Sequence, residues 1–395
     1  MAAHQLSIGL ELEANVIDID SGKAIIDFNN GAFQKLSSYL NSQGYPPLQT
    51  EFDAATIELS TLPCHDVDLA FKNLSANLHA ANNFLYQQGH LLLLLGLHPG
   101  RGRDELIMTD SPYCLASLPL MAEQGGPLFY CSFQINLGVD VRDIDYLIPL
   151  CHWLQVYMWP CSVITQSSPV FANRNTNYKS FRVRLNDALS GSRTGPLPLD
   201  ICNLSEFKSY CSNLPDEANT LRKYNVWYDI FPKLIDEKNP SAGYRIEIRL
   251  ADTTELAKLY VFTQAMVLTF MSILHKLKAK EPLIVPEHRW FMLNRDSVLK
   301  KGSEARITHS GEEFYSISDY LNTIWRPLVA NYARDFNVDI NNLILQLTGK
   351  SRASDMLKQF QTMTADQIAL NYAHSDYQKV GDGPGRTPTE SIQIV

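Results

Sequence analysis

The sequence predicts an α+β fold in which helices cover the apolar face of a mostly antiparallel sheet. The first observation is that five short stretches carry polar side chains two residues apart among apolar neighbours. Side chains at i and i+2 of a β-strand point to the same face, so each stretch predicts a strand with one polar and one apolar face. The pairs are Glu11/Glu13, Glu58/Ser60, Gln134/Asn136, Arg182/Arg184 and Glu247/Arg249.

The second observation is that segments with helical features separate these stretches. The segment 67–88 has leucines near a 3.6-residue period, and Gly89 follows it as a helix C-cap. Pro160 is expected to stop the helix that precedes it. In chain order we expect strands at 8–16, 55–62, 91–95, 130–137, 182–185 and 244–250, and helices at 31–43, 67–88, 143–159 and 259–274.

Two apolar runs among these elements are expected to be buried. The run 91–95 is entirely apolar and short, which is typical of a buried strand. The run 259–274 is uncharged but shorter than the roughly 20 residues that cross a membrane, so it predicts a core helix. The chain to 372 then looks mainly helical. Without a clear linker, we expect a single domain over 1–372, with a helical part from about 254 to 372 and a mobile tail over 373–395.

The bulk composition is that of a globular protein without a strong charge bias. The chain has 395 residues, of which 45% are hydrophobic and 19% charged, and a formal net charge of −8. This balance offers no overall electrostatic case for binding nucleic acid. The first residues lack the basic and apolar regions of a signal peptide, and the seven cysteines are widely spaced, so we expect reduced thiols in a cytoplasm and no membrane association.

The polar faces combine carboxylates with guanidinium and amide groups. A surface of glutamates alone would be typical of an exposed strand face. Carboxylate oxygens, however, suit Mg²⁺ or Mn²⁺, and arginine forks suit phosphate or carboxylate. Together they indicate a nucleotide-dependent phosphoryl transfer, in which metal ions bridge phosphates and arginines neutralise developing charge.

Short motifs in the same order resemble those of the glutamate–cysteine ligase superfamily, and most of all its type 2 branch, the bacterial carboxylate–amine ligases. No single motif is specific, but their order along residues 6 to 295 is. The motifs are Gly9-Leu-Glu-Leu-Glu13, Glu51 and Glu58 before Thr61-Leu-Pro63, Gly96-Leu-His-Pro99, Phe133-Gln-Ile-Asn-Leu-Gly138, the segment Ser167 to Tyr178 with Arg182, Trp227-Tyr-Asp-Ile-Phe-Pro232, Arg245-Ile-Glu-Ile-Arg249 with Asp252-Thr253, and Glu287-His-Arg-Trp290.

The resemblance implies a glutamine-synthetase-like sheet curved into a half funnel, and an ATP-dependent carbon–nitrogen ligase. ATP would phosphorylate the γ-carboxylate of a glutamate-like substrate, and an amine would displace phosphate to form an amide. Arg249 and Glu247 would be catalytic. The implied ligands of Mg²⁺ (or Mn²⁺) are Glu11, Glu13, Glu51, Glu58 and Glu247; the implied nucleotide and phosphate contacts are Gln134, Asn136 and Arg249; and the implied substrate contacts are Thr61, Arg182, Arg184 and Arg174.

Three features leave other interpretations open. Gln134 stands where many relatives have a histidine, and Phe231 replaces a common arginine, so the amine is undefined. Glu51 and Glu58 are an odd seven residues apart, so a bend or bulge is expected between them. The alternatives are a lapsed ligase kept as a binding or regulatory protein, and a ligase or phosphotransferase acting on a peptide or carrier protein. Expected partners are small molecules and a possible second copy of the chain.

Overall fold

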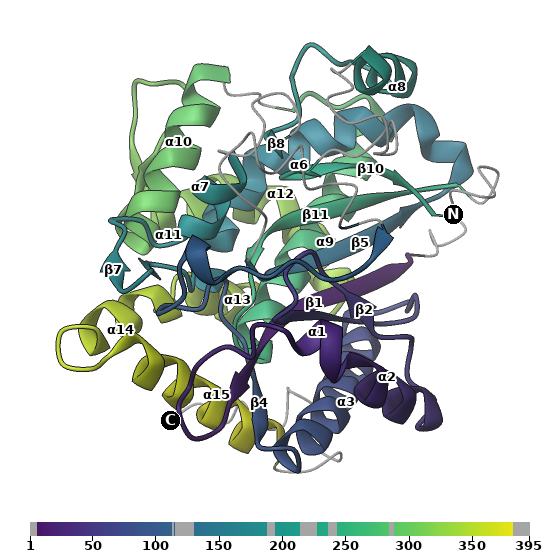
Figure 1. Ribbon diagram of the computed structural model, residues 1–395. Coiled ribbons are helices and arrows are strands. Elements are labelled where there is room, and N and C mark those ends of the chain that lie inside the picture. The colour runs from purple at the N-terminus through teal and green to yellow at the C-terminus, as the bar shows by residue number, and fades with distance from the viewer. Residues whose placement is uncertain are drawn as a thin grey trace.

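A seven-stranded antiparallel sheet forms the centre of the molecule. The computed structural model describes residues 6–112, 114, 130–187, 194–213, 227–235, 243–283 and 288–381. The sheet order is β10-β11-β5-β1-β3-β2, with β4 paired to β1 as well (Figure 1). These strands are β1 Ile8–Asp18, β2 Gln49–Thr50, β3 Thr56–Ser60, β4 His90–Leu93, β5 Ser132–Val139, β10 Ile230–Leu234 and β11 Tyr244–Asp252.

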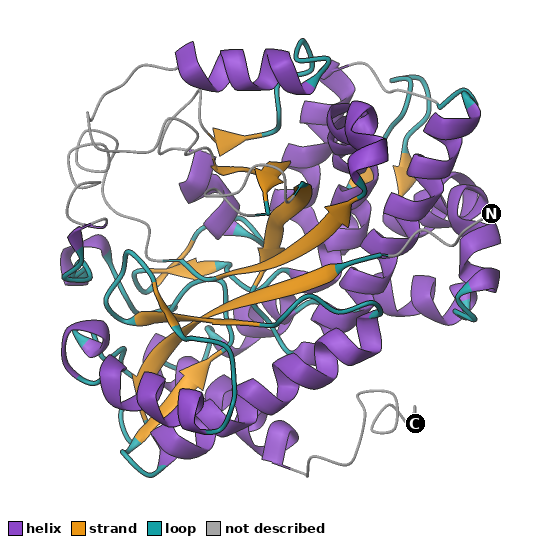
Figure 2. Cartoon of the chain, turned by 90° about the vertical axis from the view of Figure 1, so that its right-hand side faces the viewer, coloured by secondary structure: helices purple, strands orange, loops and turns teal. Residues whose placement is uncertain are grey.

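Helices pack against the sheet and continue to the end of the described chain (Figure 2). They are α1 Phe28–Gly31, α2 Phe33–Ser42, α3 Val67–Tyr86, α6 Leu147–Ser162, α7 Phe181–Asp187, α8 Leu204–Asn213, α9 Leu256–Ala279, α10 His288–Lys301, α11 Ile317–Tyr320, α12 Arg326–Asp335, α13 Ile340–Leu347, α14 Arg352–Gln359 and α15 Ala365–Gly381. Two-residue strands form small pairs outside the main sheet: β6 Val170–Phe171, β7 Arg174–Asn175, β8 Thr194–Gly195, β9 Trp227–Tyr228, β12 Arg306–Ile307 and β13 Tyr315–Ser316.

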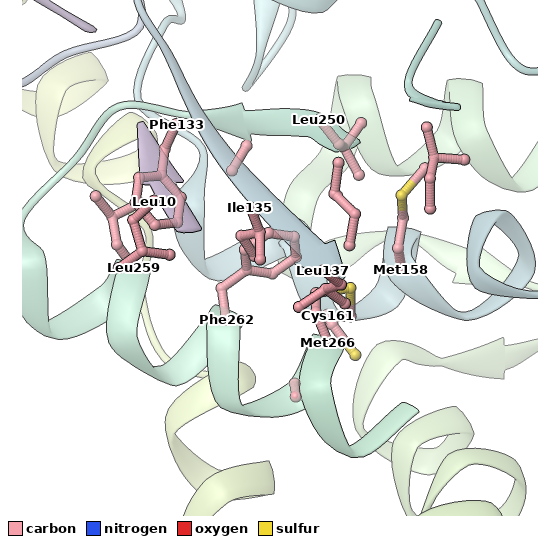
Figure 3. Close-up of a cluster of buried hydrophobic side chains, with 14 of the residues drawn as sticks. Leu10, Phe133, Ile135, Leu137, Met158, Cys161, Leu250, Leu259, Phe262 and Met266 are labelled. Atoms are coloured by element: carbon pink, nitrogen blue, oxygen red, sulfur yellow. The ribbon is translucent and has the colours of Figure 1, made fainter. Parts of the chain in front are cut away.

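The core lies between the apolar face of the sheet and helices α3, α6 and α9. Leu10 on β1 and Ile135 on β5 alternate with the polar residues of the same strands and are fully buried. They meet Phe262 of α9 in a cluster that also contains residues of α6 (Figure 3). The predicted fold class, a curved and mostly antiparallel sheet with helices on its outer face, is therefore confirmed.

Two described helical segments are long and apolar enough to cross a membrane by length and composition. They are Val141–Thr165, which contains α6, and α9. Their apolar windows are 78% and 72% buried within the protein, and both pack into the core. The prediction of a core helix at 259–274 thus agrees with the position of α9.

Four of the five polar-faced stretches lie on strands, and one does not. Residues 182–185, predicted as a strand, belong to helix α7. A strand would place Arg182 and Arg184 on one face, whereas successive helical residues are turned by about 100°. In the structure Arg182 is buried and Arg184 is exposed. The short alternating pattern is compatible with both structures, and the buried ion pair of Arg182 with Asp252 favours the helix.

Other sequence predictions also needed correction. Helix α6 does not stop before Pro160 but continues to Ser162. Strand β10 was not expected, since it contains Pro232; it is the edge strand of the sheet, where proline is tolerated. Helix α15 extends to Gly381, into the predicted tail, and residues 382–395 lie outside the described chain. The assignment of 1–372 as a single domain stays a prediction.

Candidate active site

Three glutamates, two on neighbouring strands and one just after a third strand, meet at one end of the polar face. Glu13 on β1 and Glu58 on β3 are direct cross-strand partners. Glu51 comes two residues after Gln49, which pairs with Glu58, so all three side chains point to the same face. Each offers a carboxylate oxygen within 4.8 Å of the other two. We call Glu13, Glu51 and Glu58 the acidic cluster.

The bend expected between Glu51 and Glu58 is a turn that joins the antiparallel strands β2 and β3. Asp53 in this turn is buried and accepts hydrogen bonds from Arg101 at 2.5 and 2.7 Å. Asp53 also accepts a 2.9 Å bond from the hydroxyl of Thr56, at the start of β3. A bidentate, buried pair of this kind holds the turn in one conformation, and with it the position of Glu51.

The acidic cluster has more negative charge than its surroundings neutralise. Burial, followed by repulsion from Glu13, raises the pKa of Glu51 to about 8. Burial and the neighbouring Glu11 and Glu51 hold the pKa of Glu58 well above its ordinary value. Interaction between the Glu51 and Glu58 carboxyls partly offsets the rise in the pKa of Glu51 and adds to that of Glu58. Three buried carboxylates at this separation suit a divalent cation with oxygen ligands.

Strand β5 links the acidic cluster to the opposite end of the polar face. Glu13 accepts bonds from the Ser132 amide at 2.6 Å and from the Gln134 side-chain amide at 2.7 Å. The other end of Gln134, its Oε1, accepts a 3.2 Å bond from Arg249. Two residues further along the same strand, Asn136 donates a 3.1 Å bond to Glu11. The predicted phosphate-contact residues therefore join the glutamates in one hydrogen-bonded network.

At the other end, three cations surround the single carboxylate of Glu247. Lys233 lies 2.6 Å from one oxygen and Arg249 lies 2.8 Å from the other, while Arg245 is 3.6 Å away. Burial alone raises the pKa of Glu247, but Lys233 and Arg249 outweigh it and bring the pKa to about 2. We call Lys233, Arg245 and Arg249 the basic cluster. Glu11 lies between the two clusters, and burial and then Glu247 raise its pKa.

Arg182, whose predicted contact with substrate stays a prediction, supports the strand that carries Arg249. The guanidinium pairs with the buried Asp252 at 2.8 Å and donates to the carbonyls of Leu250 and Arg249 at 2.5 and 3.2 Å. These carbonyls lie where the pairing of β11 with β5 shifts register, between Ile248 and Ala251. The guanidinium thus provides the hydrogen bonds that the neighbouring strand does not give these carbonyls where the register shifts.

Asp252 is the centre of this support. It accepts further bonds from the Ser167 amide and from the hydroxyls of Ser168 and Ser180, at 2.7 to 2.9 Å. Gly96 passes directly over it, and a Cβ there would lie 2.7 Å from the carboxyl carbon, so only glycine fits. Asp252 belongs to one of the sequence motifs, but its role in holding β11 was not predicted from the sequence. This role depends on contacts between segments far apart in the chain.

The other predicted substrate residues lie apart from the two clusters. The hydroxyl of Thr61 accepts a 3.0 Å bond from the Leu10 amide. Arg174, on β7, and Arg184, on α7, are exposed. Sequence reasoning also missed Lys233, because β10 was not recognised as a strand, and assigned no role to Arg245, although strand alternation places it on the polar face.

A small pocket opens beside Arg249. Its polar wall includes Tyr130, whose hydroxyl donates a 2.5 Å bond to Asn186. Asp229 in the same wall is neutralised by a two-bond pair with Arg295 at 2.9 and 3.1 Å. The lining residues are Tyr130, Arg182, Val183, Asn186, Tyr228, Asp229 and Arg249. The arginines give this pocket an environment suited to an anionic or polar small molecule.

Comparison with protein families gives a match over most of the chain. The family described as "Glutamate-cysteine ligase family 2(GCS2)" matches residues 7–374. A protein of Thermobifida fusca described as "Putative glutamate--cysteine ligase 2" is 26% identical over 311 residues, which are 76% of this chain and 72% of that protein. A protein of Rhodospirillum rubrum with the same description is 22% identical over 292 residues, or 72% of each.

Solved structures share the fold at low sequence identity. The glutamate–cysteine ligase of Francisella tularensis in complex with AMP superposes with a TM-score of 0.71 and 12% identity, over 96% of this chain and 89% of that one. A bifunctional glutathione synthetase from Pasteurella multocida gives a TM-score of 0.64 and 12% identity, over 95% and 53%. At such identities the likeness shows the fold alone.

Proposed function

The chain belongs to the glutamate–cysteine ligase family 2 and is an ATP-dependent carbon–nitrogen ligase, and we propose that it forms an amide on the γ-carboxylate of a glutamate-like substrate through an acyl phosphate. The family match over residues 7–374 supports the ligase class. The likeness to a ligase solved with AMP is in keeping with an adenine nucleotide as co-substrate. Glutamate, the amine, and a cytoplasmic location are parts of the same proposal.

The observation that carries the proposal is the adjacency of the acidic cluster and Arg249 on one sheet face. Gln134 connects them directly, since it bonds to Glu13 at one end and to Arg249 at the other. A phosphoryl transfer requires a cation site and a guanidinium on opposite sides of the same phosphate chain. Here both are built on strands of one sheet, which holds their spacing fixed.

The acidic cluster fits Mg²⁺ or Mn²⁺ by its chemistry. Its three carboxylates are hard oxygen ligands, and burial followed by repulsion from neighbouring carboxylates raises the pKa of Glu51 and of Glu58. Glu13, Glu51 and Glu58 would hold the cation, with Glu11 and Glu247 as further ligands by family resemblance. When bound, the cation neutralises these carboxylates and the phosphates of ATP.

The residues of the polar face would then carry out the two chemical steps. A carboxylate oxygen of the substrate attacks the terminal phosphorus of ATP, and the bond to ADP breaks. Arg249, held by Gln134 and by its own ion pair with Glu247, stabilises the charge on the transferred group. The amine next attacks the acyl carbon, a C–N bond forms, the C–O bond to phosphate breaks, and the amine loses one proton.

The pocket beside Arg249 is the proposed place for an organic substrate. It lies next to the guanidinium that would contact the transferred phosphate, so a carboxylate held there is close to the reacting atoms. Arg182 lines this pocket and also holds the backbone of Arg249, so it can act both on substrate and on position. The substrate roles of Thr61, Arg174 and Arg184 stay predictions.

The test is an amine screen with the full-length protein. Purified protein is given ATP, Mg²⁺ and glutamate with a panel of amino acids and amines, and both phosphate release and the amide product, by mass spectrometry, are measured. We expect amine-dependent release of phosphate with formation of one amide. Arg249→Ala should lower the rate by roughly 10²-fold, whereas Lys276→Gln, an outlying lysine paired with Glu281, should not change it. Folded protein that binds ATP but forms no amide with any amine would exclude this function.

A further inference from the structure

Lys233 and Arg245 place two positive charges directly opposite each other on neighbouring strands. They are paired in register across β10 and β11, so both side chains point to the polar face. Like charges at such a position destabilise a sheet unless an anion lies close to both. Lys233 lies outside the motifs that predicted the site, and Arg245 begins one of them without a predicted role. Both lie at the outer end of the face, next to the edge of the sheet.

The two nearby carboxylates, Glu247 and Glu11, do not satisfy the hydrogen-bonding groups of both cations. Glu247 accepts a short bond from Lys233, but the Arg245 guanidinium is 3.6 Å from Glu247 and 3.7 Å from Glu11. These separations are ion pairs without hydrogen-bond geometry. The buried Nε of Arg245 has no hydrogen-bond partner among the described residues. Arg249 occupies the second oxygen of Glu247, so three cations share two carboxylates.

The sheet beside the pair leaves room for a ligand. Asn136 and Gly138 of β5 face Glu247 and Arg245 across the sheet, and Gly9 of β1 faces Asn136. Gly9 carries no side chain over the polar face, and a Cβ there would meet only Asn136, at 3.5 Å, whereas Ser7 covers Gly138, 2.9 Å from where a Cβ would lie. Lys233 and Arg245 remain 35% and 25% exposed, so a solute can reach both.

We propose that Lys233 and Arg245 form an anion-binding subsite that takes an anionic group of a substrate, either a phosphate of the nucleotide or a carboxylate of the amino acid. A phosphate or carboxylate oxygen on the Gly9 side of the pair accepts bonds from both side chains and supplies the missing partner of Arg245. If Glu247 binds a cation, as the proposed function holds, Lys233 loses its present partner and turns to the substrate. The subsite thus rests on the proposed function for the identity of its ligand.

The experiment removes each charge and measures binding apart from turnover. Lys233→Gln, Arg245→Gln and the conservative Lys233→Arg are titrated by calorimetry with Mg²⁺-ATP and, separately, with glutamate, and their KM and kcat values are measured. Lys276→Gln is the matched control, because Lys276 is 28% exposed and bonds to Glu281 at 2.7 Å, much as Lys233 bonds to Glu247. Thermal unfolding of every variant checks that it is folded.

We expect each Gln variant to weaken binding of one ligand by about tenfold, with kcat changed by less than about threefold. Weaker binding of Mg²⁺-ATP alone identifies the phosphate as the ligand, and weaker binding of glutamate alone identifies the carboxylate. Lys233→Arg and Lys276→Gln should bind both ligands as the parent protein does. Unchanged dissociation constants for both ligands in both Gln variants would overturn the subsite. If the parent protein binds both ligands but forms no amide, and the Gln variants bind one ligand more weakly, the proposed function is excluded and the anion-binding subsite is not.

Discussion

The two ends of the polar face use the same residue type in opposite electrostatic situations. At the acidic end, burial and neighbouring carboxylates raise the pKa of Glu51 to about 8. At the basic end, Lys233 and Arg249 overcome the effect of burial and bring the pKa of Glu247 to about 2. Both glutamates lie on one continuous sheet. The difference is therefore set by which side chains the neighbouring strands supply, and not by burial.

This contrast indicates which end needs a ligand in order to be stable. None of the three carboxylates of the acidic cluster has an ion pair of 4.0 Å or less with a described side chain, and Arg249 reaches the cluster only through Gln134. The basic cluster has its own counter-ion in Glu247, although Arg245 remains poorly matched. A cation should therefore stabilise the first end strongly, whereas an anion at the second end would rearrange pairs that already exist.

The largest expected effect concerns the support beneath the basic end. Arg182→Gln leaves the buried carboxylate of Asp252 without its ion pair and removes a donor from two carbonyls of β11. We expect a loss of about 3–5 kcal/mol in the free energy of unfolding, measured in urea. Where the variant stays folded, kcat should also fall because Arg249 loses its position. A variant as stable as the parent would show that Asp252 and its serines hold the strand alone.

The next effect tests the counter-ion itself. Glu247→Gln leaves three cations without their shared acceptor, so the free energy of unfolding should fall by about 2–3 kcal/mol, a value reduced because Lys233 stays partly in water. Urea denaturation in a chelator measures it. Addition of Lys233→Gln should recover part of the loss, since it removes one unpaired cation. Failure of that recovery would mean that Lys233 and Glu247 are not energetically coupled.

A glutamate-to-glutamine substitution at the acidic end should change the free energy of unfolding in the opposite direction. Glu58→Gln replaces a buried carboxyl, which near neutral pH must either repel its neighbours or take up a proton on folding, by a neutral amide, so without metal the free energy of unfolding should rise by about 1 kcal/mol. In the presence of Mg²⁺ or Mn²⁺ the gain should disappear, because the variant binds the cation less tightly. Thermal unfolding with and without metal gives both values. A loss of stability without metal would contradict the idea of an uncompensated acidic cluster.

The pH dependence of the metal-free protein provides a smaller test. The pKa of Glu51 in the folded protein, about 8, lies above its ordinary value of 4.5, so the folded state holds this proton more tightly. Stability from this group is present at low pH and is lost as pH rises toward 8. Between pH 7 and 8 we expect a fall of up to about 1 kcal/mol. Glu51→Gln should flatten this slope, and a saturating divalent cation should also flatten it, because the carboxylate is then ionised in both the folded and the unfolded state.

The smallest expected effect is at Arg184, whose side chain is exposed on α7. Arg184→Gln should change the free energy of unfolding by less than about 0.5 kcal/mol and the KM values by less than about twofold. A clear rise in the KM of one substrate would restore the role that family resemblance assigned to it. Such a result would require the exposed face of α7 to contact substrate.

Four of the five polar pairs lie on the strands that their two-residue spacing predicted. A strand with one buried face alternates apolar and polar residues, and this alternation is visible in the local sequence. The pair Arg182/Arg184 lies on a helix, since so short an alternating run fits a strand and a helix equally well. The partner that favours the helix, Asp252, lies 70 residues from Arg182 in the sequence. Strand β10 was missed because Pro232 is acceptable only at a sheet edge, and an edge is defined by strand order.

The sequence by itself determined the fold class, the family and the polar face with its glutamates, amides and Arg249. Strand periodicity and motif order are local properties, so they can be seen without a structure. Only the tertiary structure decided that Glu51 joins Glu13 and Glu58, that Arg182 supports a strand, and that Lys233 and Arg245 surround Glu247. Those contacts depend on the register between strands and on the turn between β2 and β3. Both bring together side chains whose proximity cannot be read from their spacing in the sequence.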